Sequence, residues 1–108
     1  MQPIMVYMTA ESMDQAKTIA RELISNRLAA CVNILDHMQS LYWWEGKVEE
    51  SGEVVVLAKT RADLLPALTE RVQAVHSYDC PCIVSWPITD GHKPFLDWIG
   101  QETASPVG

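Results

Sequence analysis

The sequence has 108 residues, 48% of them hydrophobic and 20% charged, which is typical of a globular domain and excludes an intrinsically disordered chain. Eight Lys and Arg are scattered among fourteen Asp and Glu, and the net charge of −6 argues against nucleic acid or an anionic membrane as a partner. The odd number of cysteines, and the lack of an apolar run long enough to span a membrane, predict one cytoplasmic domain over residues 1–108.

Residues 3–9 form the first predicted strand, and they are apolar on both alternating faces, which indicates a central, buried strand. Ser12 follows with Gln15 three residues later, and this pair has the spacing of a capping box. Apolar residues then recur at helical spacing, so we expect a helix over residues 12–26 with Arg27 at its C-terminal end.

The next part of the chain is predicted to form a long β-hairpin. Residues 29–35 are its first strand, residues 36–40 a bend, and residues 41–44 a continuation in extended structure. Residues 50–52, Glu-Ser-Gly, have the composition of a turn, and residues 54–60 form the return strand. The arms of this hairpin are longer than the usual strand of about five or six residues.

A second helix, a fourth strand and a short last helix complete the predicted order. Asp63 is the expected N-cap of the second helix, and Pro66 must fall in its first turn. The fourth strand covers residues 80–86 and the last helix residues 94–103. The order βαββαβ plus one helix predicts an α+β, ferredoxin-like fold with both main helices on one face of an antiparallel sheet.

The outer part of the hairpin predicts self-association. It carries the apolar side chains of Leu41, Tyr42, Trp43, Trp44 and Val48. So much aromatic surface in water, beside a long open strand edge, would promote aggregation, whereas a closed ring of copies would cover both. The alternative is that a tryptophan folds back onto the sheet of its own chain.

Several strings make the sequence similar to the CutA divalent-cation-tolerance family. They are residues 29–34 (Ala-Ala-Cys-Val-Asn-Ile), 40–47 (Ser-Leu-Tyr-Trp-Trp-Glu-Gly-Lys), 59–60 (Lys-Thr), 76–81 (His-Ser-Tyr-Asp-Cys-Pro) and 98–99 (Trp-Ile). The resemblance implies a ferredoxin-like protomer in a homotrimer whose architecture is similar to that of the PII signalling proteins. It also implies a role in tolerance to copper and other divalent cations, with weak metal binding and no enzymatic activity.

The expected metal ligands follow from this resemblance, and the sequence departs from the family at several of them. The family's His-Pro-Tyr-Glu string reads His76-Ser77-Tyr78-Asp79 here. Some members have a second histidine where this chain has Val75, and some have a cysteine where it has Met8. The ligands that the resemblance leaves are therefore His76, with Met8 second by position.

Two other sites can be drawn from the residues themselves. Cys80 and Cys82, with His76 nearby, offer soft ligands for Cu(I) or Zn, although free cysteines are more often buried like small hydrophobic residues. A polar pocket at a subunit boundary is the second candidate, and it would bind a small anion or a metal. Its residues are Asn33, Tyr42, Trp44, Glu45, Lys59 and Tyr78. The alternative is that Lys59 and Glu45 form an interfacial ion pair.

The sequence gives little support for catalysis. It has no phosphate-binding glycine loop, no Gly-x-Ser-x-Gly and no His-Glu-x-x-His. The main functional prediction is therefore a homotrimeric copper-tolerance protein that binds the metal weakly. The second is a small-molecule-responsive, PII-like regulator or an assembly scaffold, without a physiological metal.

Overall fold

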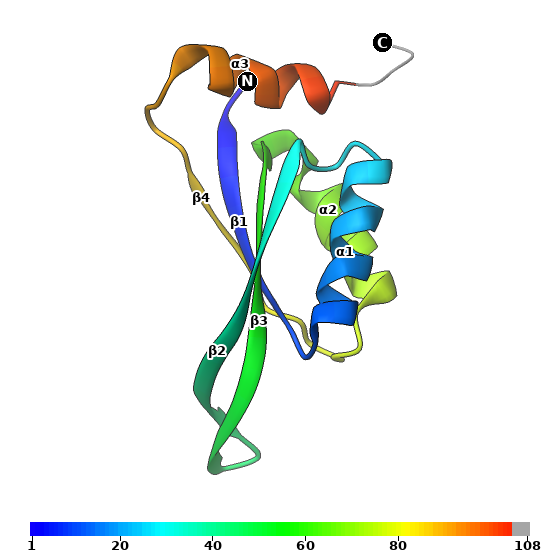
Figure 1. Cartoon of the computed structure of the whole chain (residues 1–108), viewed down its shortest axis with the longest axis vertical. Helices are drawn as coiled ribbons and strands as arrows, with labels where there is room; N and C mark the ends of the chain where they lie inside the picture. The colour runs from blue at the N-terminus through cyan, green and yellow to red at the C-terminus, as the bar shows by residue number, and fades with distance from the viewer. Residues whose placement is uncertain (105–108) are drawn as a thin grey trace.

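The computed structural model describes residues 1–104 and has a ferredoxin-like α+β fold, as the order of elements predicted. The elements are β1 (Pro3–Ala10), α1 (Met13–Ser25), β2 (Cys31–Trp44), β3 (Lys47–Arg61), η1 (Ala62–Leu64), α2 (Leu65–Val75), β4 (Ile83–Pro87) and α3 (Lys93–Glu102). The strands form one antiparallel sheet in the order β2-β3-β1-β4. Helices α1 and α2 cover one face of this sheet, and the β2–β3 hairpin extends well beyond them (Figure 1).

The hydrophobic core lies between the helices and the inner face of the sheet. Alternate residues of β1 point into it, and Val6 and Met8 have no exposed surface. Ile19 of α1 and Leu68 of α2 are equally buried and cover these strand residues. Burying each such side chain contributes about 2 kcal/mol to stability, so this layer positions the rest of the molecule.

Helix α1 begins as predicted, but only half of the capping box is present. The Ser12 hydroxyl accepts a hydrogen bond from the backbone N–H of Gln15 at 3.1 Å. The Gln15 side chain does not return to Ser12. Its amide donates to the Val75 carbonyl at 3.1 Å, and its carbonyl accepts from the Ser77 N–H at 3.0 Å. Gln15 therefore links the start of α1 to the end of α2.

Helix α1 ends in a Schellman motif in which Arg27 has a left-handed backbone, with φ of 56°. The Leu28 N–H bonds the Leu23 carbonyl at 2.9 Å, and the Arg27 N–H bonds the Ile24 carbonyl at 3.1 Å. Arg27 thus lies beyond the last helical residue, and its guanidinium contacts the Glu102 carboxylate of α3 at 2.9 Å. This pair connects the ends of two helices.

The hairpin turn lies at residues 45–46, before the predicted turn at residues 50–52. Glu45 and Gly46 have φ of 50° and 79°, the two positive angles of a type I′ turn. The prediction of a turn at residues 50–52 is wrong, because these residues lie inside β3 and pair with residues 39–41 of β2. A Gly within a polar run is not sufficient to locate a turn in a strand this long.

The predicted bend at residues 36–40 is a β-bulge within a continuous strand. The register jumps between Leu35 and Met38, so that Asp36 and His37 together oppose Val54. His37 has φ of 66°, and its backbone N–H donates to the Asp36 carboxylate at 2.7 Å. The bulge turns the hairpin relative to the rest of the sheet.

The start of α2 differs from the prediction, because the 3₁₀ turn η1 precedes it. Leu64, and not Asp63, occupies the N-cap position, and it has no side-chain cap. The Asp63 carboxylate instead lies 3.4 Å from Nε of Arg61. Pro66 falls in the first turn of α2, as its missing N–H requires. Within residues 1–104, no helix is long and apolar enough to cross a membrane.

Candidate functional site

The outer face of the sheet carries apolar side chains that nothing covers within the protomer. Leu35 is 56% exposed, and Val84 and Trp86 of β4 are comparably open. At the far end of the hairpin Trp43 is 75% exposed, so neither it nor Trp44 is folded back onto the sheet of its own chain. Large exposed apolar surfaces of this kind are typical of interaction sites.

The predicted polar pocket is only partly assembled in one protomer. The Lys59 ammonium donates to Oδ1 of Asn33 at 2.8 Å and contacts Sγ of Cys31 at 3.6 Å. These three side chains share the outer face, because Cys31 pairs with Lys59 across β2 and β3. Among residues 1–104 Lys59 makes no ion pair, since Glu45 sits at the hairpin turn, at the opposite end of β3.

Two aromatic residues of the predicted pocket lie elsewhere on the hairpin. The Tyr42 hydroxyl is 3.3 Å from Oγ of Ser51, across the strand pair. Trp44 precedes the turn and is exposed. Neither reaches Lys59 or Asn33 through a hydrogen bond in the protomer. The predicted pocket residues therefore do not converge within the described chain.

The loop between α2 and β4 is fixed by Tyr78 and His76. The Tyr78 hydroxyl donates to the Glu53 carboxylate of β3 at 2.9 Å. Its ring lies 4.7 Å from that of His76, in a tilted arrangement. His76 in turn lies 2.8 Å, through Nε2, from the Thr9 carbonyl at the end of β1. The loop is therefore attached to both central strands.

The partners of His76 define which ring nitrogen donates and which accepts. A backbone N–H can only donate, so Nδ1 of His76 is the acceptor of the 3.0 Å bond from Tyr78 N–H. A carbonyl can only accept, so Nε2 carries the proton that it donates to Thr9. The contacts thus assign the Nε2–H tautomer, and both ring nitrogens are engaged.

Acidic and hydroxyl groups gather around Glu53. Burial, followed by the hydrogen bond to Glu53, holds the pKa of Tyr78 well above its usual value. Burial is the main cause that raises the pKa of Tyr7, and the nearby charges of Cys82 and Glu53 raise it further. Burial is also the main cause that raises the pKa of the Cys82 thiol, and the charge of Glu53 adds to it. All three groups keep their protons at neutral pH, so the Tyr78 hydroxyl acts as a donor there.

Met8, the second predicted metal ligand, is placed in the core. Its side chain has no exposed surface and faces the helices from the middle of the sheet. An ion arriving from solvent would meet it only after the core had opened. The two predicted ligands therefore do not form a preorganised pair.

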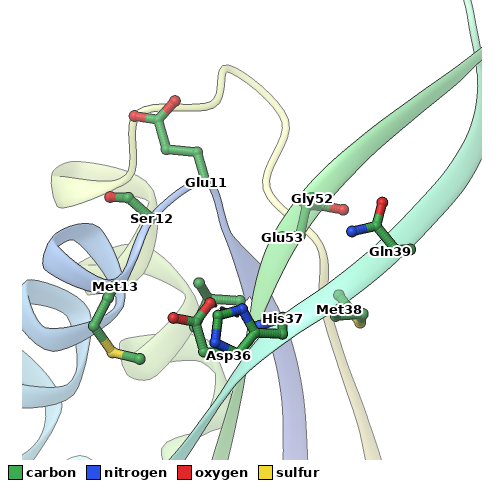
Figure 2. Close-up of a pocket in the computed structure, with 10 residues that line it drawn as sticks. Glu11, Ser12, Met13, Asp36, His37, Met38, Gln39, Gly52 and Glu53 are labelled. Carbon is green, nitrogen blue, oxygen red and sulfur yellow. Dashed lines mark hydrogen bonds between the residues drawn. The ribbon is translucent and has the colours of Figure 1, made fainter.

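A pocket that the sequence did not reveal lies between the start of α1 and the bulged part of the hairpin. It has a volume of about 270 Å³, and Figure 2 shows Ser12 and Met13 on one side and Asp36, His37 and Gln39 on the other. The Glu11 carboxylate points away from the Asp36–His37 pair. Only the bulge brings His37 here, and a bulge leaves no periodic signal in a sequence.

Metal-ligating side chains are not clustered in the described part of the chain. No group of three or more His, Cys, Asp or Glu residues within 1–104 has a geometry that could hold an ion. Cys31, Cys80 and Cys82 are all free, and Cys80 is exposed. Any metal site of one protomer would therefore use fewer than three of these side chains.

Comparisons with known proteins agree on one family. A family model described as CutA1 divalent ion tolerance protein matches residues 4–102. The chain is 45% identical, over 100 residues, to the chloroplastic protein CutA 1 of Oryza sativa subsp. japonica, and the match covers 93% of this chain and 56% of the rice protein. The chain thus spans little more than half the length of that relative.

Solved structures agree in fold over nearly their whole length. The crystal structure of CutA1 from Oryza sativa has a TM-score of 0.93 at 43% identity, covering 96% of this chain and 95% of that one. The periplasmic divalent cation tolerance protein CutA from Archaeoglobus fulgidus has a TM-score of 0.92 at 42% identity, covering 94% and 99%. The predicted fold is confirmed by both.

Proposed function

The chain belongs to the CutA1 divalent ion tolerance protein family, and from this premise we propose that it is a cytoplasmic homotrimer that serves tolerance of copper and other divalent cations. The family consists of divalent-cation tolerance proteins and not of enzymes, in agreement with the lack of catalytic motifs in the sequence. In this proposal residues 1–108 act as one domain, and metal binding is weak.

The uncovered outer face of the sheet is the observation that carries the trimer. A hairpin that extends beyond the helices, with Trp43 and Trp44 open to solvent, would be an aggregation hazard in a monomer. A ring of three copies would bury the hairpins and the sheet faces against one another and would leave the helices outside. In the same proposed ring, Glu45 at the hairpin turn of one copy would approach the surface of a neighbouring copy.

The surroundings of His76 support weak binding at that residue. An ion that took Nδ1 would displace the Tyr78 N–H, and an ion that took Nε2 would displace the proton given to Thr9. Either loss costs about 1 kcal/mol or more, which lowers the net affinity without abolishing it. Met8 joins His76 in the proposal only if the core opens locally.

The cytoplasmic location rests on the three free cysteines, which persist as thiols in a reducing compartment. Relatives are described as chloroplastic in rice and periplasmic in Archaeoglobus fulgidus, so the family is not tied to one compartment.

Native mass spectrometry before and after addition of copper under reducing conditions tests this function. We expect a trimer that gains copper, and a His76→Ala variant that remains trimeric but binds copper several-fold more weakly. His92→Ala is the matched control, because His92 is an exposed residue before α3. Unchanged affinity in His76→Ala, or a monomer at micromolar concentration, would contradict the proposal.

A second function, a small-molecule-responsive regulator or assembly scaffold, is favoured by Lys59. Its ammonium lies on the uncovered face, where it contacts Oδ1 of Asn33 and Sγ of Cys31. An ammonium that makes no ion pair within residues 1–104, at a proposed subunit boundary, is suited to a small anion. Native mass spectra of the trimer from cell extract should then show a bound anion that Lys59→Met loses and Lys59→Arg retains.

A further inference from the structure

A cysteine and a lysine are in direct contact at the open end of the β2–β3 hairpin. Cys31 pairs with Lys59 across the two strands, and the Lys59 ammonium lies 3.6 Å from Sγ of Cys31. Both residues are partly exposed, and their side chains lie on the outer face of the sheet. A sulfur that can be oxidised and a nitrogen that can act as a nucleophile therefore lie side by side.

Hydrogen bonds fix the backbone around this pair. The Ala30 N–H donates to the Lys59 carbonyl at 2.9 Å, so contact between the two strands begins immediately before Cys31. Thr60 has no exposed surface, and its hydroxyl donates to the Leu28 carbonyl at 2.7 Å. Because side chains alternate along a strand, the buried Thr60 holds Lys59 on the outer face, beside the sulfur.

Asn33 positions the lysine side chain. Its Oδ1 accepts a hydrogen bond from Nζ of Lys59 at 2.8 Å. Cys31 and Asn33 are two residues apart in β2 and project to the same side, so Nζ contacts the sulfur and the amide oxygen together. The four-carbon stem of lysine is flexible, which allows Nζ to close the remaining distance to the sulfur without a movement of the backbone.

We propose that Cys31 and Lys59 form a reversible sulfur–nitrogen cross-link when the protein meets hydrogen peroxide. In the first step the sulfur attacks one peroxide oxygen, the O–O bond breaks, and the products are a sulfenic acid and water. The sulfur loses the two electrons that the peroxide gains. In the second step Lys59 gives one proton to solvent, and its Nζ attacks the sulfur. The S–O bond breaks, and the hydroxide leaves as water with a second proton from the nitrogen, which yields a sulfenamide.

The cross-link changes two properties of the outer face. It replaces a contact between β2 and β3 with a covalent bond, and it converts the Lys59 ammonium into a neutral nitrogen. Both reacting atoms belong to one chain, so no second copy has to supply a residue. Subunit interfaces contain water, and peroxide is hardly larger, so the reaction remains open to an assembled ring. A thiol reductant restores both side chains.

Mass spectrometry of the full chain after treatment with hydrogen peroxide tests the cross-link. The background combines Cys80→Ser with Cys82→Ser, because a disulfide between those two thiols would also remove two hydrogens. We expect the intact chain to lose two hydrogens, and peptide mapping to find the peptide of Cys31 joined to that of Lys59. Dithiothreitol should restore the original mass. A second background, Cys80→Ala with Cys82→Ala, guards against a folding defect of the serine variants.

Lysine variants identify the nitrogen. Lys59→Arg keeps the charge, but a guanidinium stays protonated, so oxidation should stop at the sulfenic acid, which dimedone traps on Cys31. Lys47→Arg at the start of β3 is the matched control and should leave the yield of cross-link unchanged.

Four results would overturn the proposal. They are a Cys31 thiol that peroxide leaves intact, a dimedone adduct on Cys31 in the background without any joined peptide, a cross-link that persists in Lys59→Arg, and a joined peptide that retains a peroxide oxygen. None of these results depends on metal binding at His76 or on the number of subunits, so the cross-link and the proposed function fail independently.

Discussion

The hydroxyl of Tyr78 donates a hydrogen bond of 2.9 Å to the carboxylate of Glu53, and this contact joins the α2–β4 loop to the middle of the hairpin's return strand. It holds the loop together with the contacts of His76 with Thr9 and of Ser77 with Gln15. The contact uses the hydroxyl proton of Tyr78, which makes it sensitive to alkali.

Tyr78→Phe should lower the free energy of unfolding at neutral pH. It should also make that free energy fall less steeply as the pH rises into the alkaline range. The hydrogen bond to a charged acceptor contributes about 1–2 kcal/mol, while the stacking on His76 remains. The folded-state pKa of Tyr78 is raised above 10.0, so its contribution is complete below pH 10.0 and is lost as pH rises beyond that value. Urea unfolding from pH 7 to 11 measures both effects. Parallel pH profiles for the two proteins would contradict this linkage.

Thiol alkylation should distinguish the two cysteines of the loop. Cys80 is exposed, whereas burial and Glu53 raise the pKa of Cys82 and reduce its thiolate fraction. We therefore expect iodoacetamide at pH 7.5 to modify Cys80 first, and the rate at Cys82 to keep rising as the pH passes 9.0. Peptide mass spectrometry of timed samples gives both rates. Faster labelling of Cys82 would show that the loop is not held as described.

Elements with a strong periodic signal could be predicted from the sequence, and single-residue geometry could not. The apolar stripe of α1 and the two apolar faces of β1 follow from burial, which acts on every residue of an element at once. Gln15 shows the limit. Its spacing from Ser12 predicts a capping box, yet its side chain finds better partners at Val75 and Ser77, which tertiary structure alone brings near.

The site was harder to predict for the same reason. The side chains of Lys59 and Asn33 meet on the outer face because β2 and β3 pair side by side, and strand patterns of this kind can be read from a sequence. The prediction placed Glu45 beside Lys59 and Asn33 only by assuming a neighbouring copy of the chain. Within one protomer, Glu45 lies at the far end of the hairpin. The bond between Tyr78 and Glu53 joins residues 25 apart in the chain, and no local pattern reports it.

Two glycine substitutions should show where the hairpin turns. Gly46 has φ of 79°, and a Cβ there would meet no atom within 4 Å, so Gly46→Ala is opposed only by backbone strain of about 1 kcal/mol. Gly52 lies inside β3, and a Cβ there would make ordinary contacts at 3.8 Å with the Gln39 side chain. Gly52→Ala should therefore be neutral or slightly stabilising. Thermal unfolding of both variants measures the difference, and the reverse order would place the turn at residues 50–52.

Arg27 offers a test of the α1 terminus, because two of its roles oppose each other. Its left-handed backbone, with φ of 56°, strains any residue other than Gly by about 1 kcal/mol. Its guanidinium, however, bonds Glu102 at 2.9 Å in a pair that is nearly half exposed and contributes little. Arg27→Ala loses the pair and keeps the strain, whereas Arg27→Gly loses the pair and removes the strain.

We therefore expect the Gly variant to be more stable than the Ala variant by about 1 kcal/mol in urea unfolding, with the wild type between them or close to Ala. Equal stability of the two variants would mean that the Schellman motif does not form, and a wild type more stable than Gly would assign the larger energy to the link between α1 and α3.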